Sequence, residues 1–462
     1  MNTLPAWRAG LAAFVTTLCA LPAWAEMLTV PPGSSIQAAV RQAQPGDTIR
    51  VMPGTYRETV FIDKQDITLQ GVVVNGQWAV LDGGGKLNDG VLASGHGVTI
   101  QKLWIKGYKG NGIMTQGANN YRILDNVVDG GFYGIFPQFG KNGLVARNRV
   151  TRVEDAGIYV GMSDNADVVG NQAWGNVIGI ESENSRDILI EGNHLYGNTA
   201  GIAITLIPGL PVKDAARTHI RHNFILDNNL KNFAPASSVA AGVPQGVGVL
   251  LLAVKDATLE GNIITGNQTV AVMTSDHATF GMASDTKVDP FPAGIAVLDN
   301  HFADNGRKPA PVFRELLKGA GATRADLAAT GKERDSCIAQ PQAIASIGTR
   351  RWKTCEPGRT LAAIKTAMLP EPVKSPPLTL EQKGRLTYLA VCTGCHAYNT
   401  QLHGPSVIAI KALYQANADG LAKYAASPQR KRKDFAEMPG QAYLGDEVLK
   451  AVAEYILNEL KN

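Results

Sequence analysis

Two cysteines and a histidine near the C-terminus have the spacing of a covalent cofactor site. Cys392, Cys395 and His396 form the pattern Cys-x-x-Cys-His, which is an attachment signal for haem c. Two thiols three residues apart can reach both vinyl groups of one haem, and the adjacent histidine then serves as an axial ligand of the iron. The pattern predicts one covalently attached haem c.

The residues after this motif carry a resemblance to a known family. The segment Leu402-His403-Gly404-Pro405-Ser406 resembles the loop that follows the haem helix in class I cytochromes c. The resemblance implies that the Pro405 carbonyl accepts the ring N–H of His396. It also implies Met438, which precedes a proline, as the second axial ligand, with His403 as the alternative. It covers residues 378–462, where helices are expected at 380–388 and 445–460, and implies a small all-α domain.

The middle of the chain offers few groups for acid–base chemistry. Glu181 and Glu183 are the candidate catalytic residues, with Asp164 and Arg186 close to them in the sequence. Hydrolases and lyases need two or three carboxylates, and lyases also need a cation beside them. Because this set is small, we expect the middle domain to bind a ligand and not to cleave it.

A repeat of about 22 residues positions these candidates. Two markers recur in phase, an Asn after an apolar run and an Ile after a Gly. The Asn marker is found at Asn126, Asn148, Asn171, Asn193, Asn223, Asn262 and Asn300, and the Ile marker at Ile113, Ile135, Ile158, Ile180 and Ile202. A period of this length with short apolar runs predicts three strands per coil, stacked as a parallel β-helix with the Asn side chains in an internal ladder.

The segment before the repeat supports this fold class. A short helix is expected from Ile36, capped by Ser34 or Ser35, where it would cover the open end of the solenoid. The stretch resembles the opening of pectate-lyase-like right-handed β-helix proteins and of the carbohydrate-active and copper-site-maturation proteins that share the fold. The resemblance extends over residues 28–306 and implies the fold, not an activity.

If the Ile of each repeat faces the core, alternate residues face outward. The outward row then contains Met114, Phe136 and Tyr159, which form a possible binding face, followed by Glu181. Three insertions flank the same column of strands and could form the walls of a cleft. They span residues 206–217, 230–246 and 276–292, and the last carries His277, Asp285, Lys287 and Asp289.

The remaining segments set the domain boundaries. Residues 1–25 have the pattern of a signal peptide cleaved after Ala25, and no later segment is apolar enough to span a membrane. We therefore expect a periplasmic or otherwise exported protein with a β-helix over 26–306. Residues 307–377 form a connecting region with helices at 312–319 and 324–331, a Cys337–Cys355 disulfide and a Pro-rich linker. The cytochrome-like domain follows at 378–462.

Charge and composition exclude some functions and leave three open. The net charge of +4 is too small for a nucleic-acid binder, although Arg430 to Lys433 could attract an acidic redox partner. The favoured reading is an electron-transferring monohaem cytochrome whose β-helix binds a partner or a glycan. The alternatives are a polysaccharide lyase, epimerase or hydrolase on the β-helix, and an electron-transfer subunit of an exported oxidoreductase.

Overall fold

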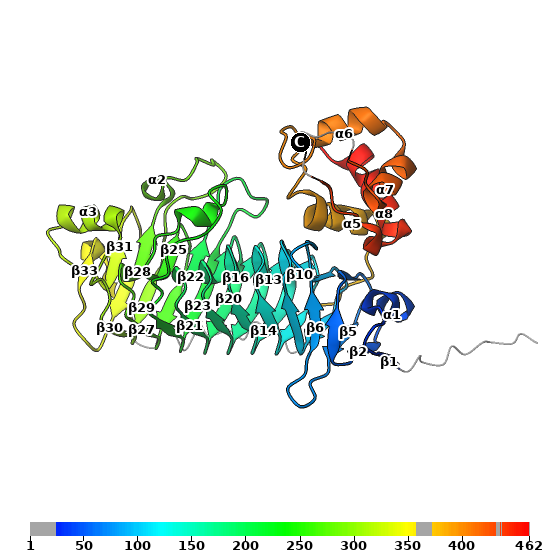
Figure 1. Ribbon diagram of the computed structural model, residues 1–462. Coiled ribbons are helices and arrows are strands. Elements are labelled where there is room, and N and C mark those ends of the chain that lie inside the picture. Colours follow the sequence, from blue (N-terminus) through cyan, green and yellow to red (C-terminus); the bar gives the residue numbers. More distant parts are fainter. Residues whose placement is uncertain (1–24, 357–371, 431–434, 436, 462) are drawn as a thin grey trace, which may run out of the picture.

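The computed structural model describes residues 25–356, 372–430, 435 and 437–461. Within these ranges the chain forms a long solenoid of short strands, followed by a group of helices (Figure 1). The expected signal peptide, apart from Ala25, lies outside the described residues, as do Lys431 to Lys433. In the described part of the chain, no helix is long and apolar enough to cross a membrane.

Three parallel sheets run along the solenoid, here named A, B and C, and successive coils add strands to each in turn. Sheet A consists of β1 Met27–Val30, β2 Thr48–Val51, β5 Thr68–Gly71, β8 Thr99–Gln101, β11 Arg122–Leu124, β14 Lys141–Ala146, β17 Asp164–Val169, β20 Arg186–Glu191, β23 Ala216–Arg221, β26 Thr258–Glu260, β29 Ala296–Leu298, β32 Cys337–Ala339 and β34 Lys353–Thr354. Sheet B consists of β3 Gly54–Tyr56, β6 Ala79–Asp82, β9 Leu103–Lys106, β12 Val127–Asp129, β15 Arg149–Thr151, β18 Gln172–Trp174, β21 His194–Tyr196, β24 Phe224–Leu226, β27 Ile263–Thr265 and β30 His301–Ala303. Sheet C consists of β4 Val60–Ile62, β7 Val91–Ala93, β10 Asn111–Gln116, β13 Tyr133–Gln138, β16 Ala156–Gly161, β19 Ile178–Glu183, β22 Ala200–Thr205, β25 Val247–Leu252, β28 Val270–Ser275, β31 Leu327–Ala329 and β33 Ser346–Ile347.

The parallel β-helix predicted from the repeat is therefore confirmed, and so is the inward Ile row. Ile113 pairs in register with Ile135, which pairs with Ile158. All three are fully buried in the core of the solenoid. Because side chains alternate along a strand, the inward Ile of each coil fixes which neighbouring side chains face outward.

The predicted Asn ladder runs through the turn between sheets A and B. The side-chain amide of Asn148 donates to Asn171 Oδ1 at 3.0 Å, and that of Asn171 donates to Asn193 Oδ1 at 3.0 Å. The ladder continues to Asn223 across 30 residues, so the insertion leaves the coil intact. Each amide also bonds a carbonyl of the preceding coil, as from Asn193 to Val168 O at 2.8 Å.

A second ladder, which the sequence analysis missed, occupies the turn between sheets B and C. Asn176 donates to Asn198 Oδ1 at 3.1 Å, and Asn198 donates to Asn228 Oδ1 at 2.9 Å. Asn228 in turn donates to Asn267 at 3.1 Å. Two corners of each of these coils are thus held by buried amides, which satisfy turn backbone groups that water cannot reach.

The N-terminal end of the solenoid is covered by α1, Ile36–Gln42, as predicted. Ser35 is its N-cap, and Glu58 accepts hydrogen bonds from the N–H groups of Ile36 and Gln37 at 2.8 and 3.0 Å. Lys64 donates to carbonyls at the other end of the helix. Opposite charges at the two ends match the helix dipole.

The solenoid continues past residue 306 at its other end. The predicted helix at 312–319 is α3, Pro311–Gly319. The helix predicted at 324–331 is wrong, because Leu327–Ala329 forms β31 and pairs with β28 in sheet C. Apolar spacing over a short segment does not distinguish a helix from a buried strand.

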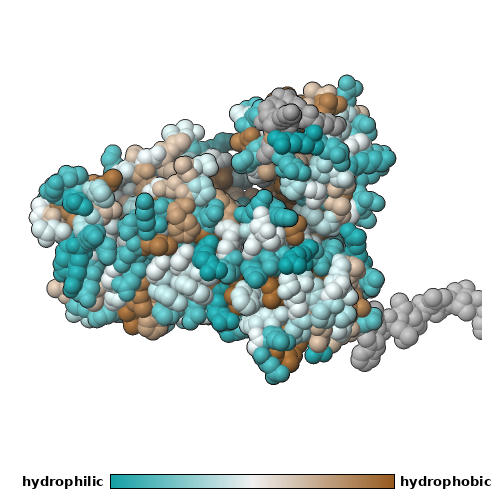
Figure 2. All heavy atoms as spheres, viewed as in Figure 1, coloured by the Kyte–Doolittle hydropathy of each residue, from teal (hydrophilic) through white to brown (hydrophobic). Residues whose placement is uncertain are grey.

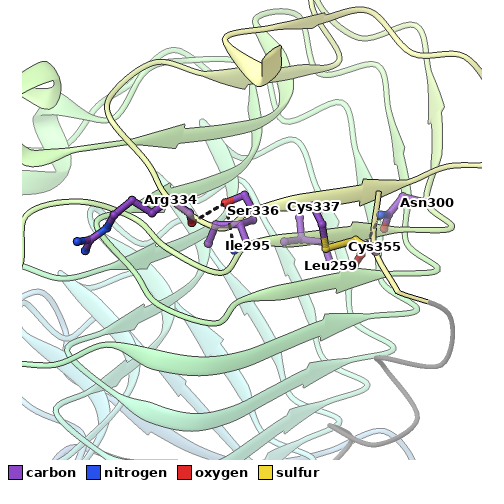
Figure 3. Close-up of a disulfide and its surroundings, with 7 residues drawn as sticks. All are labelled: Leu259, Ile295, Asn300, Arg334, Ser336, Cys337 and Cys355. Carbon is purple, nitrogen blue, oxygen red and sulfur yellow. Dashed lines mark hydrogen bonds between the residues drawn. A yellow bond between two sulfur atoms is a disulfide. The ribbon is translucent and has the colours of Figure 1, made fainter. Parts of the chain in front are cut away.

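The predicted disulfide closes the last coil. Cys337 on β32 bonds Cys355, just after β34, with the Cα atoms 4.9 Å apart (Figure 3). Both sulfurs are buried beside Ala296 and Leu298 of the preceding coil. The bond fastens the edge of sheet A, where pairing between coils ends.

Helices make up most of the regular structure in the described residues after 377. They are α5 Leu380–Thr387 with a π-helical turn η3 Tyr388–Cys392, α6 Val407–Tyr414, α7 Ala418–Ala426, and α8 Asp446–Glu454 with a π-helical turn η5 Tyr455–Glu459. Short 3-10 turns are η1 Val239–Gly242, η2 Thr349–Arg351 and η4 Ala442–Leu444, and α2 spans His277–Phe280. Both helices predicted at 380–388 and 445–460 are present. They cross where Gly384 leaves no room for a side chain, since a Cβ there would lie 2.4 Å from the Ala451 carbonyl oxygen.

The C-terminal helices pack on the outward face of sheet C (Figure 1). Lys383 of α5 forms an ion pair with Asp63 at 2.7 Å, with both side chains about four-fifths buried. The segment before α5 is also fastened, because Val373 and Asn120 exchange hydrogen bonds at 2.8 and 2.9 Å. The shared apolar cluster joins Phe61, Leu92 and Met114 of the solenoid to Leu444, Val448 and Leu449.

The ladder gives a test of the fold. Replacing Asn193 by Ala leaves two buried backbone groups of the preceding coil, Asn171 N and Val168 O, without its side chain, so the free energy of unfolding should fall by about 1–3 kcal/mol. Urea unfolding followed by circular dichroism measures this change. Exposed Gln172 on β18 is the control, since Gln172→Ala should change stability by less than about 0.5 kcal/mol. Equal stabilities for the two variants would contradict the role of the ladder.

Candidate functional site

The candidate site lies on the outward face of sheet C, where β13, β16 and β19 are neighbours. Tyr159 is in register with Glu181, and Gly161 with Glu183. The next strand places Ala203 beside Glu181 and Thr205 beside Glu183. The outward row expected from alternation is the one that the structure has.

The aromatic part of this row is a packed floor and not an open binding face. The Phe136 and Tyr159 rings stack at 4.2 Å with an interplanar angle of 7°, and Tyr133 contacts both rings. Met114, Phe136 and Tyr159 are 3%, 6% and 6% exposed. Their ring faces contact each other because successive coils stack in register, and Met114 also belongs to the cluster shared with the C-terminal helices.

A third carboxylate that the sequence analysis missed joins the two predicted ones. Asp155 lies just before β16 and accepts a hydrogen bond from Ser238 Oγ at 2.6 Å. Thr205 Oγ1 lies 3.4 Å from Glu181 Oε1, and Tyr159 donates a hydrogen bond to Glu183. Asp155, Glu181 and Glu183 are called the acid cluster below.

Gly161 makes the contact between Tyr159 and Glu183 possible. It occupies the place in the outward row between Gln138 and Glu183. A Cβ at Gly161 would lie 3.1 Å from the Phe136 ring and 3.4 Å from the Tyr159 ring. The missing side chain leaves space for the tyrosine to lean toward Glu183.

Burial shifts the protonation of all three acids. Loss of solvation, with Asp155 and Glu183 nearby, holds the pKa of Glu181 well above its usual range. Burial also raises the pKa of Glu183 to about 7, although the hydrogen bond from Tyr159 acts in the opposite direction. The pKa of Asp155 rises to about 6 for the same reason, opposed by the bond from Ser238. Near neutral pH the cluster therefore holds both protonated and ionised carboxyl groups.

Among the described residues, no Lys or Arg side chain shifts the pKa values of this cluster. The groups that shift the three carboxyls, within the described residues, are the carboxyls themselves and the hydroxyls of Tyr159, Thr205 and Ser238. The sequence candidate Arg186 belongs to a different pair, because its guanidinium bonds Asp164 at 2.5 Å. The structure thus does not bring Asp164 and Arg186 into the site.

The insertions form a raised wall beside the site. Ser238 ties residues 230–246 to Asp155, and Ala240 and Val243 of this loop belong to the same apolar cluster as Tyr159. The C-terminal helices rise over the other end of the sheet, and Figure 2 shows the surface hollowed between the two raised parts. The acid cluster lies between the coils that the C-terminal helices cover and the coils that the 230–246 loop covers.

The polar residues of the third insertion hold the loops together. Asp285 accepts hydrogen bonds from Gly209 N and Lys213 Nζ at 2.9 and 2.7 Å, and His277 Nε2 lies 2.6 Å from Leu206 O. Asp289 pairs with Lys255 at 3.1 Å and also with Arg334. Their bonds give His277, Asp285 and Asp289 structural roles, and Lys287 contributes its backbone N–H to Asp285.

The residues of the Cys-x-x-Cys-His motif fit a covalently attached haem. Cys392 and Cys395 are free thiols one helical turn apart, since Cys395 N bonds Cys392 O at 3.1 Å. His396 Nδ1 lies 2.8 Å from the Pro405 carbonyl oxygen, so Nε2 remains available as a ligand. A Cβ at Gly404 would lie 2.4 Å from the imidazole, so only glycine allows the loop to pack on the ring. Met438 is partly buried and His403 is exposed.

Comparisons with known proteins find matches to the β-helix. Residues 46–243, less than half of the chain, match the family model described as periplasmic copper-binding protein (NosD). Two solved structures that resemble the chain are the A-modules of the mannuronan C-5 epimerases AlgE4 and AlgE6 from Azotobacter vinelandii. Both are 18% identical, with TM-scores of 0.48 and 0.49; they cover 68% and 66% of this chain and 94% and 88% of their own. DFA-IIIase from Arthrobacter chlorophenolicus A6 has a TM-score of 0.43, 11% identity and coverage of 68% and 94%. No curated protein matches.

These similarities concern the fold. The parallel β-helix itself rests on the three sheets of the chain. In the described residues, no three His, Cys, Asp or Glu side chains gather closely enough to hold a metal ion.

The prediction that the chain is an electron carrier with a β-helix scaffold is wrong. The family model that matches residues 46–243 is described as a periplasmic copper-binding protein, and the solved structures named above include carbohydrate-active β-helix enzymes. The alternative, a carbohydrate-active enzyme on the β-helix, agrees better with these findings. Sequence reasoning favoured the carrier because the Cys-x-x-Cys-His motif is local, whereas the acid cluster depends on contacts such as that between Asp155 and Ser238, 83 residues apart.

The acid cluster predicts how stability depends on pH. Between pH 4.5 and 7 the folded chain keeps a proton on Glu183 that the unfolded chain has released, so the free energy of unfolding falls as pH rises through this window. Glu183→Gln should remove about 2–3 kcal/mol of this fall. Urea unfolding at pH 4.5 and 7.5 measures the difference.

The matched control is Glu154→Gln, because Glu154 is exposed and lies beside Asp155 in the chain. It should keep the pH dependence of the wild type. A Glu183→Gln protein with an unchanged pH dependence would show that Glu183 is not a raised-pKa acid.

Proposed function

We propose that the acid cluster on sheet C hydrolyses glycosidic bonds. The observation that carries this proposal is the pair Glu181 and Glu183, two residues apart on one face of β19 and buried, with the pKa of each raised by burial. Paired carboxyl groups, one protonated and one ionised, are what glycoside hydrolysis requires.

The roles follow from the surroundings of each carboxyl group. Glu181 keeps its proton and serves as the acid that protonates the leaving glycosidic oxygen. Glu183, whose pKa is lowered by the Tyr159 hydroxyl relative to burial alone, is the base that accepts a proton from the attacking water. The glycosidic C–O bond breaks and a new C–O bond forms to the water oxygen. The proton that Glu181 donates to the leaving oxygen is matched by the proton that Glu183 accepts from the water. Asp155 acts through Glu181 and Glu183, because its charge raises the pKa of both.

Within the described residues, the cluster has no cation beside it, and this arrangement favours hydrolysis over lyase and epimerase chemistry. Proton abstraction beside a uronate carboxylate needs that carboxylate to be neutralised, and no Lys or Arg is among the described groups that act on the cluster. The substrate proposed for the cluster is therefore an uncharged sugar unit. Export by the N-terminal segment would place the protein where such glycans occur.

Kinetics with neutral oligosaccharides test this function. Glu181→Gln and Glu183→Gln should each lower kcat by about 10²–10⁴-fold, measured as release of reducing ends, while Glu154→Gln keeps the wild-type rate. Retained activity in both cluster variants, or no activity of the wild type on any neutral glycan in a broad panel, would reject the proposal. Unsaturated products from a uronate polymer would support a lyase instead.

The pH dependence of kcat distinguishes positioning roles of Tyr159 and Asp155 from purely structural ones. Tyr159→Phe removes a bond that lowers the pKa of Glu183, so the acidic limb of kcat should move to higher pH. Asp155→Asn removes a charge that raises the pKa of both glutamates, so both limbs should move to lower pH. Unshifted limbs in the two variants would contradict the assigned roles.

We further propose that residues 378–462 are a class I cytochrome c domain carrying one haem c. Cys392 and Cys395 would hold the haem covalently, with His396 and Met438 as axial ligands. The 2.8 Å contact between His396 Nδ1 and the Pro405 carbonyl oxygen supports this set, as does the packing of α5 on α8 at Gly384. A bound haem would supply a redox-active iron beside the β-helix.

Mass spectrometry under denaturing conditions tests the cofactor. The exported chain should be heavier than its polypeptide by one haem, and a Cys392→Ala, Cys395→Ala double variant should lose that mass. Met438→Ala should keep the covalent haem but bind added imidazole more tightly, while His403→Ala leaves the spectrum unchanged. A wild-type chain without covalent haem, from a host that attaches haem c to other proteins, would exclude it.

A further inference from the structure

A concave region of different character lies at the corner between sheets A and B. A cavity of about 430 Å³ there is lined by Arg50 of β2, Gln70 of β5, Trp78, Lys102 and Asp125. Cavities of this size accommodate small ligands. It is called the corner cavity below, and it lies across the solenoid from the outward face of sheet C.

One wall of the corner cavity is a hairpin between β5 and β6. Val74 and Gln77 exchange backbone hydrogen bonds at 3.0 and 2.9 Å. Asn75 and Gly76 between them have φ of 51° and 77°, as a type I′ turn requires. The hairpin is therefore a defined arm, and it brings Trp78 to the cavity at its base.

The charges in the corner cavity are unbalanced. Arg50 and Lys102 are exposed, and in the described part of the chain neither has an ion-pair partner. The one carboxylate in the lining, Asp125, is already bound by the Arg147 guanidinium through two hydrogen bonds of 2.8 Å. Two cations are thus left to attract an anion.

The remaining lining suits a sugar ring. Trp78 is partly exposed, and the Arg149 guanidinium lies 5.8 Å from its ring centroid. An indole presents an apolar surface to the C–H face of a sugar, and the Gln70 amide can bond hydroxyl groups. Guanidinium and ammonium groups bind carboxylates through charge-assisted hydrogen bonds.

We propose that the corner cavity binds a carboxylated sugar unit, such as a uronate, of a glycan. The site needs no group of the acid cluster and goes beyond the proposed hydrolysis. It lies on a different face of the solenoid and carries the opposite charge. The corner cavity holds an anionic unit of the glycan, whereas the sugar at the acid cluster is uncharged.

Calorimetric titration of the full chain with a four-unit oligogalacturonate tests the corner cavity. Arg50→Ala and Lys102→Ala should each weaken binding by at least about tenfold. Trp78→Ala should weaken it as well, and raised salt should weaken it in the wild type. The matched control is Lys86→Ala, because Lys86 is exposed but is not part of the lining.

Each outcome decides the matter. Selective loss of binding in the Arg50, Lys102 and Trp78 variants supports the proposal. Absence of binding by the wild type, or equal binding by all variants, overturns it. Competition by inorganic sulfate as strong as that by free galacturonate, or equal binding of a neutral four-unit oligosaccharide, would overturn the assignment to a carboxylated sugar.

Discussion

The structure depends on the pairing of each coil with the next. Neighbouring parallel strands lie about 4.8 Å apart, and a slip of one residue would turn every inward side chain outward. The Asn ladders oppose such a slip at two corners, because each amide bonds both the next Asn and a carbonyl of the preceding coil. This fixed register sets the columns on which all surface chemistry of the solenoid is built.

The acid cluster is a consequence of that register. Tyr159, Glu181 and Thr205 occupy the outward side of three consecutive strands, so their side chains meet although they are more than 20 residues apart. Stacked aromatic rings on the adjoining coils and the loop around Ser238 then exclude water. Burial keeps the pKa values of the three acids high. The opposite corner of the solenoid uses the same register to gather cations instead.

Local repetition made much of this predictable. The Ile and Asn markers repeat with the coil, so the core row, the first ladder and the outward position of Glu181 and Glu183 followed from the sequence. Contacts between distant segments did not follow, and they account for the errors at the candidate site. Met114 was expected on an open face but belongs to the apolar cluster shared with Val448 and Leu449. Asp155 was overlooked because its partner Ser238 lies in an insertion.

A crystal structure of the full-length Glu183→Gln protein, soaked with a neutral oligosaccharide, tests the central claim most directly. The account predicts a sugar unit in the hollow on sheet C, with a glycosidic oxygen within hydrogen-bond distance of Glu181 and a ring close to Tyr159. An oligosaccharide bound elsewhere on the solenoid, with the acid cluster out of contact with any glycosidic oxygen, would contradict it.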